Sequence, residues 1–512
     1  MFAGLTFPFP EGLTPNIPAA DYAADLRANG ASSMVGTDCP KSSRELNSAT
    51  ACANLKSPPD PASPTFGDIS TSFTMTDFWD SHPDGKKDLL RLLTGNGKWL
   101  AWPDKETDTN DAGSKRIAGC REQVEDKLND ALHSTNVVVL LGSGASFCAK
   151  NADGSKAPGM WDLWHAVRNG YGHAAFDQIV KDVVGDVPAE GKENIEGLLS
   201  LCKMSIELLR VQSVNDQLFT QRPKLESLEK FITTAEKTIL EKVDFVKPDT
   251  ELAAHTGFIR KFGRRSPEKP RVKLFTTNYD LCIETAAARL GVVLVDGFSH
   301  AAVQRFNRDH FQHDIVRRSS KSTKADYLEG VFHSYKLHGS VDWRRQSDGV
   351  VIRSQAEATD ELRPVLIYPR STKYQEAFET PYLDMFAALQ EALREPDTTL
   401  IVSGFGFADD HISAPIWSAI ETNLSLRVIL CDRGFVPHQR LDAIDAHEID
   451  LELEKQRRYQ KKIIKLVQQG DSRITVLNGR FEDLANALPE ISGKTDRQLL
   501  RDRLDKLGEL DK

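Results

Sequence analysis

The sequence predicts an α/β fold in which helices cover both faces of a parallel sheet. From about residue 115 onward, short β-branched segments alternate with helical patterns, which is typical of βα units. Polar or glycine-containing motifs directly follow several of these segments, as they do at the carboxyl edge of an open parallel sheet. Between about residues 185 and 250, apolar residues recur at helical spacing with no strand between them. We therefore expect a Rossmann-like sheet with an inserted α-helical subdomain.

The expected strands are short and lie mostly in the second half of the chain. They are residues 136–141, 271–276, 291–295, 365–368, 398–403, 426–431 and 473–477, with a further short strand before His338. Residues 111–490 are expected to form the sheet domain, and residues 491–512 a charged helix or tail. Residues 1–110 are expected to be a partly irregular extension, because stretch 56–72 is rich in Pro, Ser, Asp and Thr.

The segment 447–466 is acidic at its start and basic later, an order that suits the macrodipole of a solvated helix. The less favoured alternative is a nucleic-acid-binding face made by Arg457, Arg458, Lys461, Lys462 and Lys465.

Composition excludes several classes of protein. The net charge of -9 over 512 residues argues against a molecule that binds nucleic acid with its whole surface. The seven cysteines are scattered and never spaced C-x-x-C, which indicates reduced thiols in a cytoplasmic protein. The chain has no apolar run of about 18 residues for a membrane span, and its start lacks the basic and apolar regions of a signal peptide.

The segment 136-NVVVLLGSGASF-147 predicts a buried strand that runs into a small-residue turn. In such a turn, Gly142 and Gly144 let backbone amides approach a pyrophosphate. Phe147 stands where the redox fingerprint has its third glycine, and Asp162, at the spacing of its acidic residue, lies in an apparently helical segment. A dehydrogenase is therefore disfavoured.

Three further motifs follow predicted strands: 274-LFTTNYD-280, 335-YKLHGSVDW-343 and 400-LIVSGFGFADDHI-412. With the GSGAS turn, these motifs resemble the sirtuin-like superfamily, which has GAGxS, TQNID, HG and a late glycine motif in the same order. The resemblance is strongest to the bacterial sirtuin-like NAD hydrolases of anti-phage defence systems. It spans about residues 130 to 490 and implies that NAD is bound as a substrate.

Two departures from the family pattern bear on the reaction. Protein-deacylating sirtuins carry a zinc module of two C-x-x-C pairs, which the cysteines of this sequence cannot form. The PDFR segment is also absent, and 157-APGMWDLW-164 stands in its place. Both losses disfavour deacylation, favour simple hydrolysis of NAD, and lead us to expect no zinc.

The roles of the predicted catalytic residues follow from their chemistry. A neutral imidazole suits the activation of water or of a ribose hydroxyl, so we assign the base to His338. A carboxamide orients water and ribose hydroxyls without adding charge, which suits Asn278. Asp280 either stabilises developing positive charge or caps the helix that starts near Leu281, and the two alternatives are equally weighted.

The remaining predicted residues would bind the nucleotide. By resemblance, the phosphate, ribose and adenosine would be held by Gly142, Ser143, Gly144, Ala145, Ser146, Thr277, Asp296, Gly339, Ser403 and Gly404. For Asp296 a merely polar strand end is an equally good explanation. The run 309-DHFQHD-314 has possible metal-ligand spacing, but a connecting loop explains it better. Asp409 or Asp410 is expected to cap a helix.

The leading hypothesis is an NAD glycohydrolase that depletes NAD during abortive infection. Such an effector needs regulation, and the resemblance implies a homo-oligomer with a separately encoded HerA/FtsK-type ATPase as sensor. Neither a membrane nor direct nucleic-acid binding is expected. The alternatives are an NAD-dependent protein deacylase and a non-catalytic subunit that binds NAD or ADP-ribose.

Overall fold

A computed structural model describes residues 90–107, 115–188, 193–210, 224–318, 326–356, 359, 362–366, 380–436 and 447–490. Every described residue belongs to one compact unit, Ser70–Lys512. The predicted tail 491–512 and most of the predicted extension lie outside the described residues.

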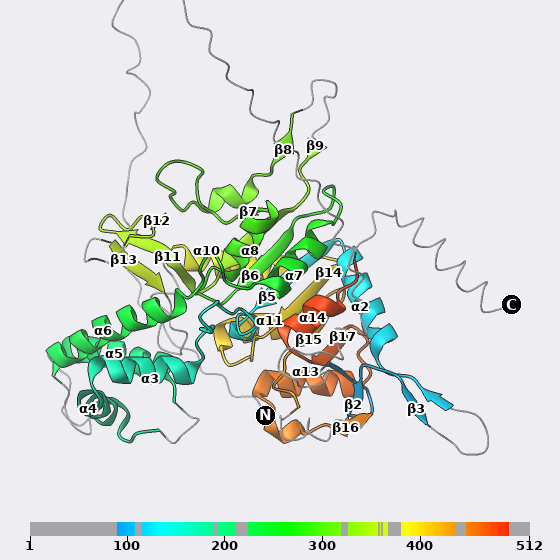
Figure 1. The fold of residues 1–512 in the computed structure, drawn as a ribbon, viewed down its shortest axis with the longest axis horizontal. Coiled ribbons are helices and arrows are strands. Elements are labelled where there is room, and N and C mark those ends of the chain that lie inside the picture. The colour runs from blue at the N-terminus through cyan, green and yellow to red at the C-terminus, as the bar shows by residue number, and fades with distance from the viewer. Residues whose placement is uncertain are drawn as a thin grey trace, which may run out of the picture. The chain divides into compact units, whose positions relative to one another are not determined.

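A ten-stranded sheet forms the centre of this unit (Figure 1). Its strand order is β16-β2-β1-β17-β15-β14-β5-β6-β10-β7, and the seven strands from β17 to β7 are parallel. These seven are β5 (Asn136–Leu141), β6 (Val272–Thr276), β7 (Val293–Val295), β10 (Val331–Lys336), β14 (Thr398–Ser403), β15 (Arg427–Cys431) and β17 (Ile474–Asn478). The predicted parallel α/β fold is confirmed.

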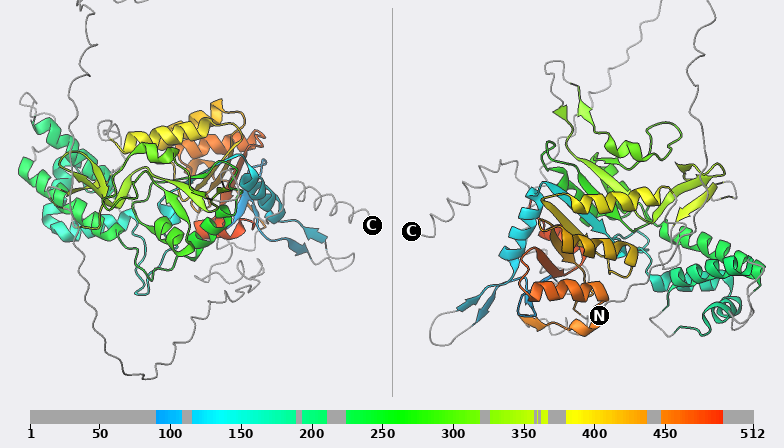
Figure 2. Two further views of the ribbon diagram at one scale, coloured as in Figure 1. Left: turned by 90° about the horizontal axis from the view of Figure 1, so that it is seen from above. Right: turned by 180° about the vertical axis from the view of Figure 1, so that it is seen from behind.

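Each face of the sheet packs against its own group of helices, as β5 illustrates. Val138 and Leu140 belong to one hydrophobic core, whereas Val137, Val139 and Leu141 belong to the other. Successive side chains of a strand point to opposite faces, so a strand that is buried on both faces is apolar throughout. The first core contains α10 (Tyr382–Arg394), α11 (Asp410–Thr422) and α13 (Arg458–Gln468), which lie together on one face in Figure 2. The second contains α2 (Arg121–His133), α7 (Ala253–Gly263), α8 (Cys282–Leu290) and α14 (Phe481–Ala487).

Three antiparallel strands extend the sheet beyond β17. They are β1 (Arg91–Leu93), β2 (Lys98–Ala101) and β16 (Glu448–Asp450). The last part of the predicted extension therefore belongs to the main sheet. Its strands have three or four residues each, too few to show a periodic pattern in sequence.

The predicted helix over 447–466 is correct only in its second half. Residues 448–450 form the edge strand β16, η4 (Leu453–Lys455) follows, and the helix begins at Arg458. It buries Ile463 and Ile464 against the sheet. The sequence does not predict the edge strand, because β16 pairs with β2 through backbone groups and this pairing does not depend on the order of charged side chains.

The inserted helical subdomain consists of α3 (Met160–Tyr171), α4 (His173–Val184), α5 (Ile195–Arg210) and α6 (Leu225–Val243). It begins earlier than the range expected from sequence, because α3 and α4 share its hydrophobic core. Tyr279, which follows β6, is also part of that core, and its hydroxyl donates to Glu196 Oε1 at 3.4 Å. The subdomain thus packs directly on the segment that follows a central strand.

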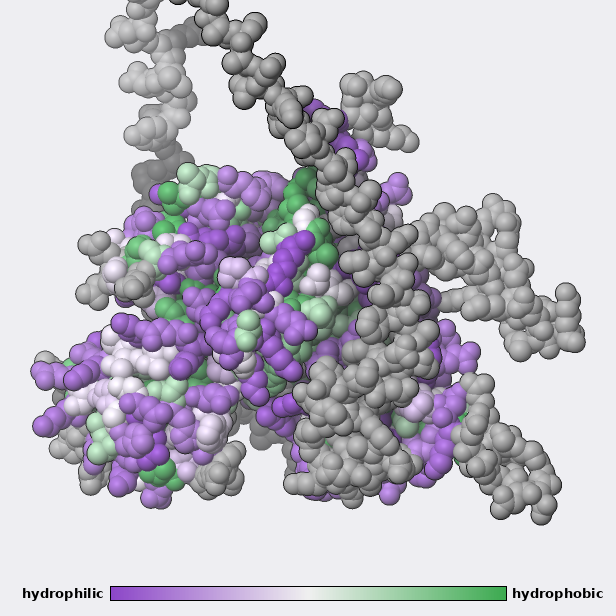
Figure 3. All heavy atoms as spheres, viewed as in Figure 1, coloured by the Kyte–Doolittle hydropathy of each residue, from purple (hydrophilic) through white to green (hydrophobic). Residues whose placement is uncertain are grey.

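Smaller elements complete the fold. They are the sheet of β11 (Gly339–Gln346), β12 (Val351–Arg353) and β13 (Leu362–Leu366), the pairs β3 (Lys105–Thr107) with β4 (Lys115–Ile117) and β8 (Val316–Arg317) with β9 (Asp326–Tyr327), and the turns η1 (Ser143–Ala145) and η3 (Arg308–Gln312). The predicted strand near 365–368 is thus β13, outside the parallel sheet. On the face in Figure 3, hydrophilic side chains cover most of the described surface. None of the described helices is long and apolar enough to cross a membrane.

Candidate functional site

The four sequence motifs meet at the carboxyl edge of the parallel sheet. They follow β14, β5, β6 and β10, which are consecutive neighbours in the sheet. Backbone hydrogen bonds continue the pairing beyond the strands: Thr277 N donates to Leu141 O at 3.0 Å, and Leu337 N donates to Thr276 O at 2.8 Å. Residues that are 61 and 136 positions apart in the chain are therefore held side by side, as the strand-end pattern predicts.

The two glycine motifs pack directly against each other. Gly144 N donates to Gly404 O at 3.0 Å, and a Cβ on Gly142 would lie 2.5 Å from the same oxygen. Gly404 has φ +65°, and a Cβ there would lie 2.5 Å from Ala145 N. This contact between loops itself requires the glycines, independently of any bound phosphate. Each glycine serves to bring the GSGAS turn close to the SGFG turn.

Asn278 is anchored to the GSGAS turn through its amide nitrogen. Its Nδ2 donates to Gly142 O at 2.9 Å and to Ser146 Oγ at 2.8 Å. The Gly142 carbonyl can only accept, so this contact fixes which end of the carboxamide is nitrogen. Asn278 Oδ1 is buried and has no hydrogen-bond partner among the described residues. A buried acceptor without a partner costs free energy, and a hydroxyl or water donor supplied by a ligand would remove that cost.

The two oxygens of Asp280 have different partners, and its predicted role in stabilising developing charge stays a prediction. Oδ1 accepts from Cys282 N at 3.0 Å and so satisfies the start of α8. Oδ2 accepts from Ser146 Oγ at 2.6 Å. Ser146 therefore links Asn278 to Asp280, and a carboxylate lies beside the predicted ribose site.

His338 lies at the end of β10 and is bonded to an acidic residue that follows β14. Its Nε2 is 3.1 Å from Asp409 Oδ2, and only 5% and 9% of the two side chains are exposed. Burial would raise the pKa of Asp409, but hydrogen bonds from His338 and from the His411 backbone hold that pKa below its usual range. A carboxylate only accepts hydrogen bonds, so the contact places the proton of His338 on Nε2 and leaves Nδ1 as the basic nitrogen.

An ion pair between a buried lysine and a partly exposed glutamate holds the TTNYD segment in place. Lys336, the last residue of β10, donates from Nζ to Asp280 O and lies 3.2 Å from Glu284 Oε1. Burial raises the pKa of Glu284, while the Lys336 ammonium opposes that shift. The lysine thus ties the loop after β6 to the first turn of α8.

Other predicted residues lie near the edge with different contacts. Asp296 follows β7 and forms an ion pair with Arg353. Ser403 is fully buried, and its Oγ has no partner among the described residues. Gly339 has φ +89°, and a Cβ there would lie 2.0 Å from Val365 O, so a close approach to β13 requires this glycine. The nucleotide-binding roles of these residues stay predictions.

Asp409, Lys336 and Glu284 were not predicted as site residues. The sequence did indicate Asp409 as a helix cap, and the structure confirms it: Asp409 Oδ1 accepts from His411 N at 2.9 Å. Its contact with His338 joins residues 71 positions apart, which no local pattern reveals. For Lys336, the sequence signal that could have indicated a site residue is its position as a charged residue at the end of a mostly buried strand.

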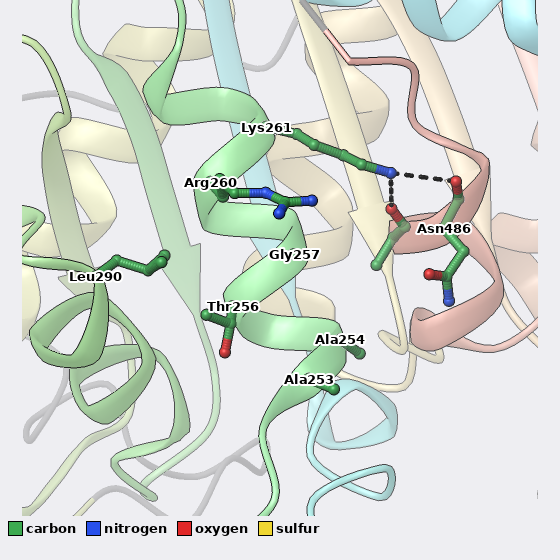
Figure 4. A pocket seen from close by; sticks show the side chains of 9 residues that line it. Ala253, Ala254, Thr256, Gly257, Arg260, Lys261, Leu290 and Asn486 are labelled. Atoms are coloured by element: carbon green, nitrogen blue, oxygen red, sulfur yellow. Dashed lines mark hydrogen bonds between the residues drawn. The ribbon is translucent and has the colours of Figure 1, made fainter. Parts of the chain in front are cut away.

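Two other places were candidates for a functional site, the run 309–314 and a hollow between α7, α8 and α14. In the run 309–314, Asp314 pairs with Arg271 at 2.8 Å, and the described part of the chain holds no cluster of three or more potential metal ligands. A hollow of about 270 Å³ between α7, α8 and α14 contains none of the predicted site residues (Figure 4). There Lys261 donates to the carbonyls of Ala485, Asn486 and Leu488, so it caps α14, and burial lowers its pKa to about 8.

Comparison with known families agrees with this geometry. Residues 272–451 match the profile of the SIR2-like domain, and the matched range includes Asn278, His338 and Asp409. This part of the chain is similar to the SIR2-like domain. The GSGAS turn precedes the matched range, but its contacts with Gly404 and Asn278 make it part of the same site. The SIR2-like domain also agrees with NAD as the predicted nucleotide.

Individual proteins add little to the family match. No curated protein matches the chain. A Sir2 homologue variant in complex with ADP-ribose is 14% identical, over 68% of this chain and 97% of that chain, with a TM-score of 0.30. A Sir2 variant with a deacetylated p53 peptide and 3'-O-acetyl-ADP-ribose is 10% identical, over 73% and 99%, with a TM-score of 0.31. These values are too low to support a conclusion beyond that of the SIR2-like domain.

The contact between the glycine loops can be tested by adding one methyl group. We expect Gly404→Ala to lower the free energy of unfolding by about 2 kcal/mol or more, because the left-handed backbone and the contact with Ala145 both oppose a Cβ. The control is Gly257→Ala in α7, where a Cβ meets nothing within 4 Å; there we expect a gain of roughly 0.5–1 kcal/mol. Urea unfolding measures both, and equal stability of the two variants would contradict the prediction.

The ion pair below the TTNYD segment is expected to show strong coupling between its partners. Lys336→Met leaves the partly exposed Glu284 without its cation and should cost about 2 kcal/mol of unfolding free energy, less than the loss of a partner from a fully buried pair. Adding Glu284→Gln removes the uncompensated charge, so the double variant should recover part of that loss. Thermal and urea unfolding of the single and double variants form a double-mutant cycle. Simple additivity of the two substitutions would show that the pair is not coupled.

Proposed function

We propose that the SIR2-like domain is an NAD glycohydrolase, which cleaves NAD to nicotinamide and ADP-ribose. The observation that carries the proposal is the joint placement of Asn278 and His338 at the ends of the adjacent strands β6 and β10. Asn278 offers a buried acceptor without a partner, and His338 offers a nitrogen whose protonation state is set by Asp409. Both groups suit a substrate with hydroxyl donors, such as the ribose of NAD.

The proposed reaction uses these groups in a defined way. The bond between C1' of the ribose and the nicotinamide nitrogen breaks, and its electron pair leaves with nicotinamide. Positive charge grows on the ribose, where the Asp280 carboxylate can stabilise it. Asn278 orients the ribose hydroxyls or the water through Oδ1. The water oxygen forms the new bond to C1', and its proton passes to Nδ1 of His338 and then to solvent.

The cysteines support hydrolysis over protein deacylation. The sequence has no C-x-x-C pair from which the four-cysteine zinc module of deacylating sirtuins could form. Four cysteines are buried as free thiols in separate parts of the fold: Cys120 before α2, Cys202 in α5, Cys282 in α8 and Cys431 in β15. Water is therefore the favoured acceptor of the ADP-ribosyl group.

The biological setting proposed for this activity is defence against phage by abortive infection. Support comes from the resemblance of the GSGAS, TTNYD, HGS and SGFGF motifs to those of bacterial anti-phage NAD hydrolases. Free turnover of NAD would be toxic to the cell that makes the protein, so the activity must be controlled. We propose control by homo-oligomerisation and by a separately encoded ATPase of the HerA/FtsK type.

Substitution of the two central residues tests the proposed reaction. We expect Asn278→Ala and His338→Ala each to reduce nicotinamide release by roughly 100-fold or more, because each removes a group that acts on the reacting ribose or water. Chromatography of NAD, nicotinamide and ADP-ribose measures the loss. Asp314→Asn, whose side chain pairs with Arg271 away from these motifs, is the matched control and should retain activity. Turnover like that of the wild type in both site variants would contradict the proposal.

The same assay separates the proposal from its two alternatives. Nicotinamide release that depends on an added acyl-lysine peptide would identify a deacylase. Saturable NAD binding without turnover, both alone and with the partner present, would identify a binding subunit. The glycohydrolase requires release of nicotinamide and ADP-ribose from NAD and water alone once the protein is active.

The proposed control by a partner predicts an interaction that can be isolated. If an ATPase of the HerA/FtsK type is encoded next to this chain, the two proteins should co-purify and the complex should hydrolyse NAD faster than the chain alone. Size-exclusion chromatography with an NAD assay of each fraction tests both expectations. Full activity of the isolated chain, unchanged by the ATPase, would contradict this mode of control.

A further inference from the structure

We propose that Asp409 is a positioning residue that sets the tautomer and orientation of His338. The proposal rests on the proposed function, since His338 is the base of that reaction. Two observations carry the proposal. The loop after β14 reaches the end of β10, and both carboxylate oxygens of Asp409, at the end of that loop, accept hydrogen bonds. Neither feature follows from the match to the SIR2-like domain.

The loop 404–409 crosses two strand ends to deliver this carboxylate. In the sheet, β14 and β10 are separated by β5 and β6, so their ends are roughly 14 Å apart, or three inter-strand spacings. The loop starts at Gly404, which packs on the GSGAS turn, and finishes beside His338. It therefore runs along the same edge as Gly142 and Asn278.

The backbone of this loop contains an unusual conformation. Phe407 has φ +55°, a left-handed conformation that is costly for a residue with a bulky side chain. Its ring is 3% exposed and packs against Phe405 with centroids 5.1 Å apart. Hydrophobic packing thus holds the loop in a turn that leads Asp409 toward β10.

Helix capping does not account for the Asp409 side chain. The cap uses Oδ1 alone, and Ser, Thr or Asn would serve equally well at that position. Burying a carboxylate is costly unless both of its oxygens are paired. Oδ2 is paired with His338 Nε2 at 3.1 Å, and the two side chains are almost completely buried. The contact with His338 therefore explains why a carboxylate, and not an uncharged capping residue, stands at position 409.

The consequence for His338 is chemical. An acceptor fixed at Nε2 holds the proton there, stabilises the imidazolium that forms when Nδ1 takes up a proton, and restricts rotation of the ring. Asp409 would act on NAD cleavage only through His338. Its loss should thus lower kcat with little change in KM, because no contact with the substrate is removed.

Two substitutions at this position separate positioning from capping. Asp409→Ser keeps a cap but cannot reach His338. Asp409→Asn keeps the shape, and because its oxygen is needed to accept from His411 N, its N–H donor faces Nε2. Asp410→Asn is the matched control, because Asp410 is an exposed acid in the same helix turn and has no contact with His338 among the described residues. We expect kcat to fall by roughly 100-fold or more in Asp409→Asn and by at least about 10-fold in Asp409→Ser. The control should match the wild type, and the melting temperatures of all three should agree within a few degrees.

NMR of protein labelled with nitrogen-15 histidine measures the tautomer of His338 directly and does not require NAD cleavage. With His338→Gln to assign the signal, the wild type should show the Nε2–H tautomer of His338, and Asp409→Asn should shift it toward Nδ1–H. A tautomer unchanged by Asp409→Asn, wild-type kcat in both Asp409 variants, or an equal loss in Asp410→Asn would each overturn the proposal. If the wild type cleaves no NAD, the proposed function fails, and the tautomer alone decides the role of Asp409.

Discussion

The close approach of two glycine turns determines the geometry of the whole carboxyl edge. Because Gly142 and Gly144 lie against Gly404, the loops after β5 and β14 are held at backbone contact. From the first turn, Ser146 and the Gly142 carbonyl fix the amide of Asn278. From the second, the chain leads to Asp409 and hence to His338. Asn278 and His338, which share no direct bond, are thus positioned by one contact that involves no side chain.

The sequence could predict the features that depend on local chemistry. Apolar β-branched runs identified the central parallel strands, and the polar residues after them identified Asn278 and His338 as neighbours. It could not predict contacts between distant residues. The bond from Asp409 to His338 and the pairing of Lys336 with Glu284 depend on the final packing of four strands. The edge strands β1, β2 and β16 are held by backbone pairing and carry no periodic pattern.

The glycines of the GSGAS turn also show how one sequence feature can satisfy two requirements. A bound phosphate and a neighbouring loop both demand a backbone without a Cβ, so the motif alone cannot distinguish them. In this structure the neighbouring loop accounts for Gly142 and Gly144 fully. We therefore expect recognition of a nucleotide to depend on the polar groups around the turn, above all Asn278 and Ser146.

Tyr279 joins the helical subdomain to the TTNYD segment through the hydrophobic core of that subdomain. The residue lies between Asn278 and Asp280, yet its ring belongs to the hydrophobic core of α3 to α6. Opening of that core would expose the Tyr279 ring and release the chain on either side of it. Amide exchange of the TTNYD segment should accordingly report on the stability of helices that are remote from the sheet. A ligand that bound the packed form of those helices more tightly than the open form would raise the population of the state in which Asn278 is held in place.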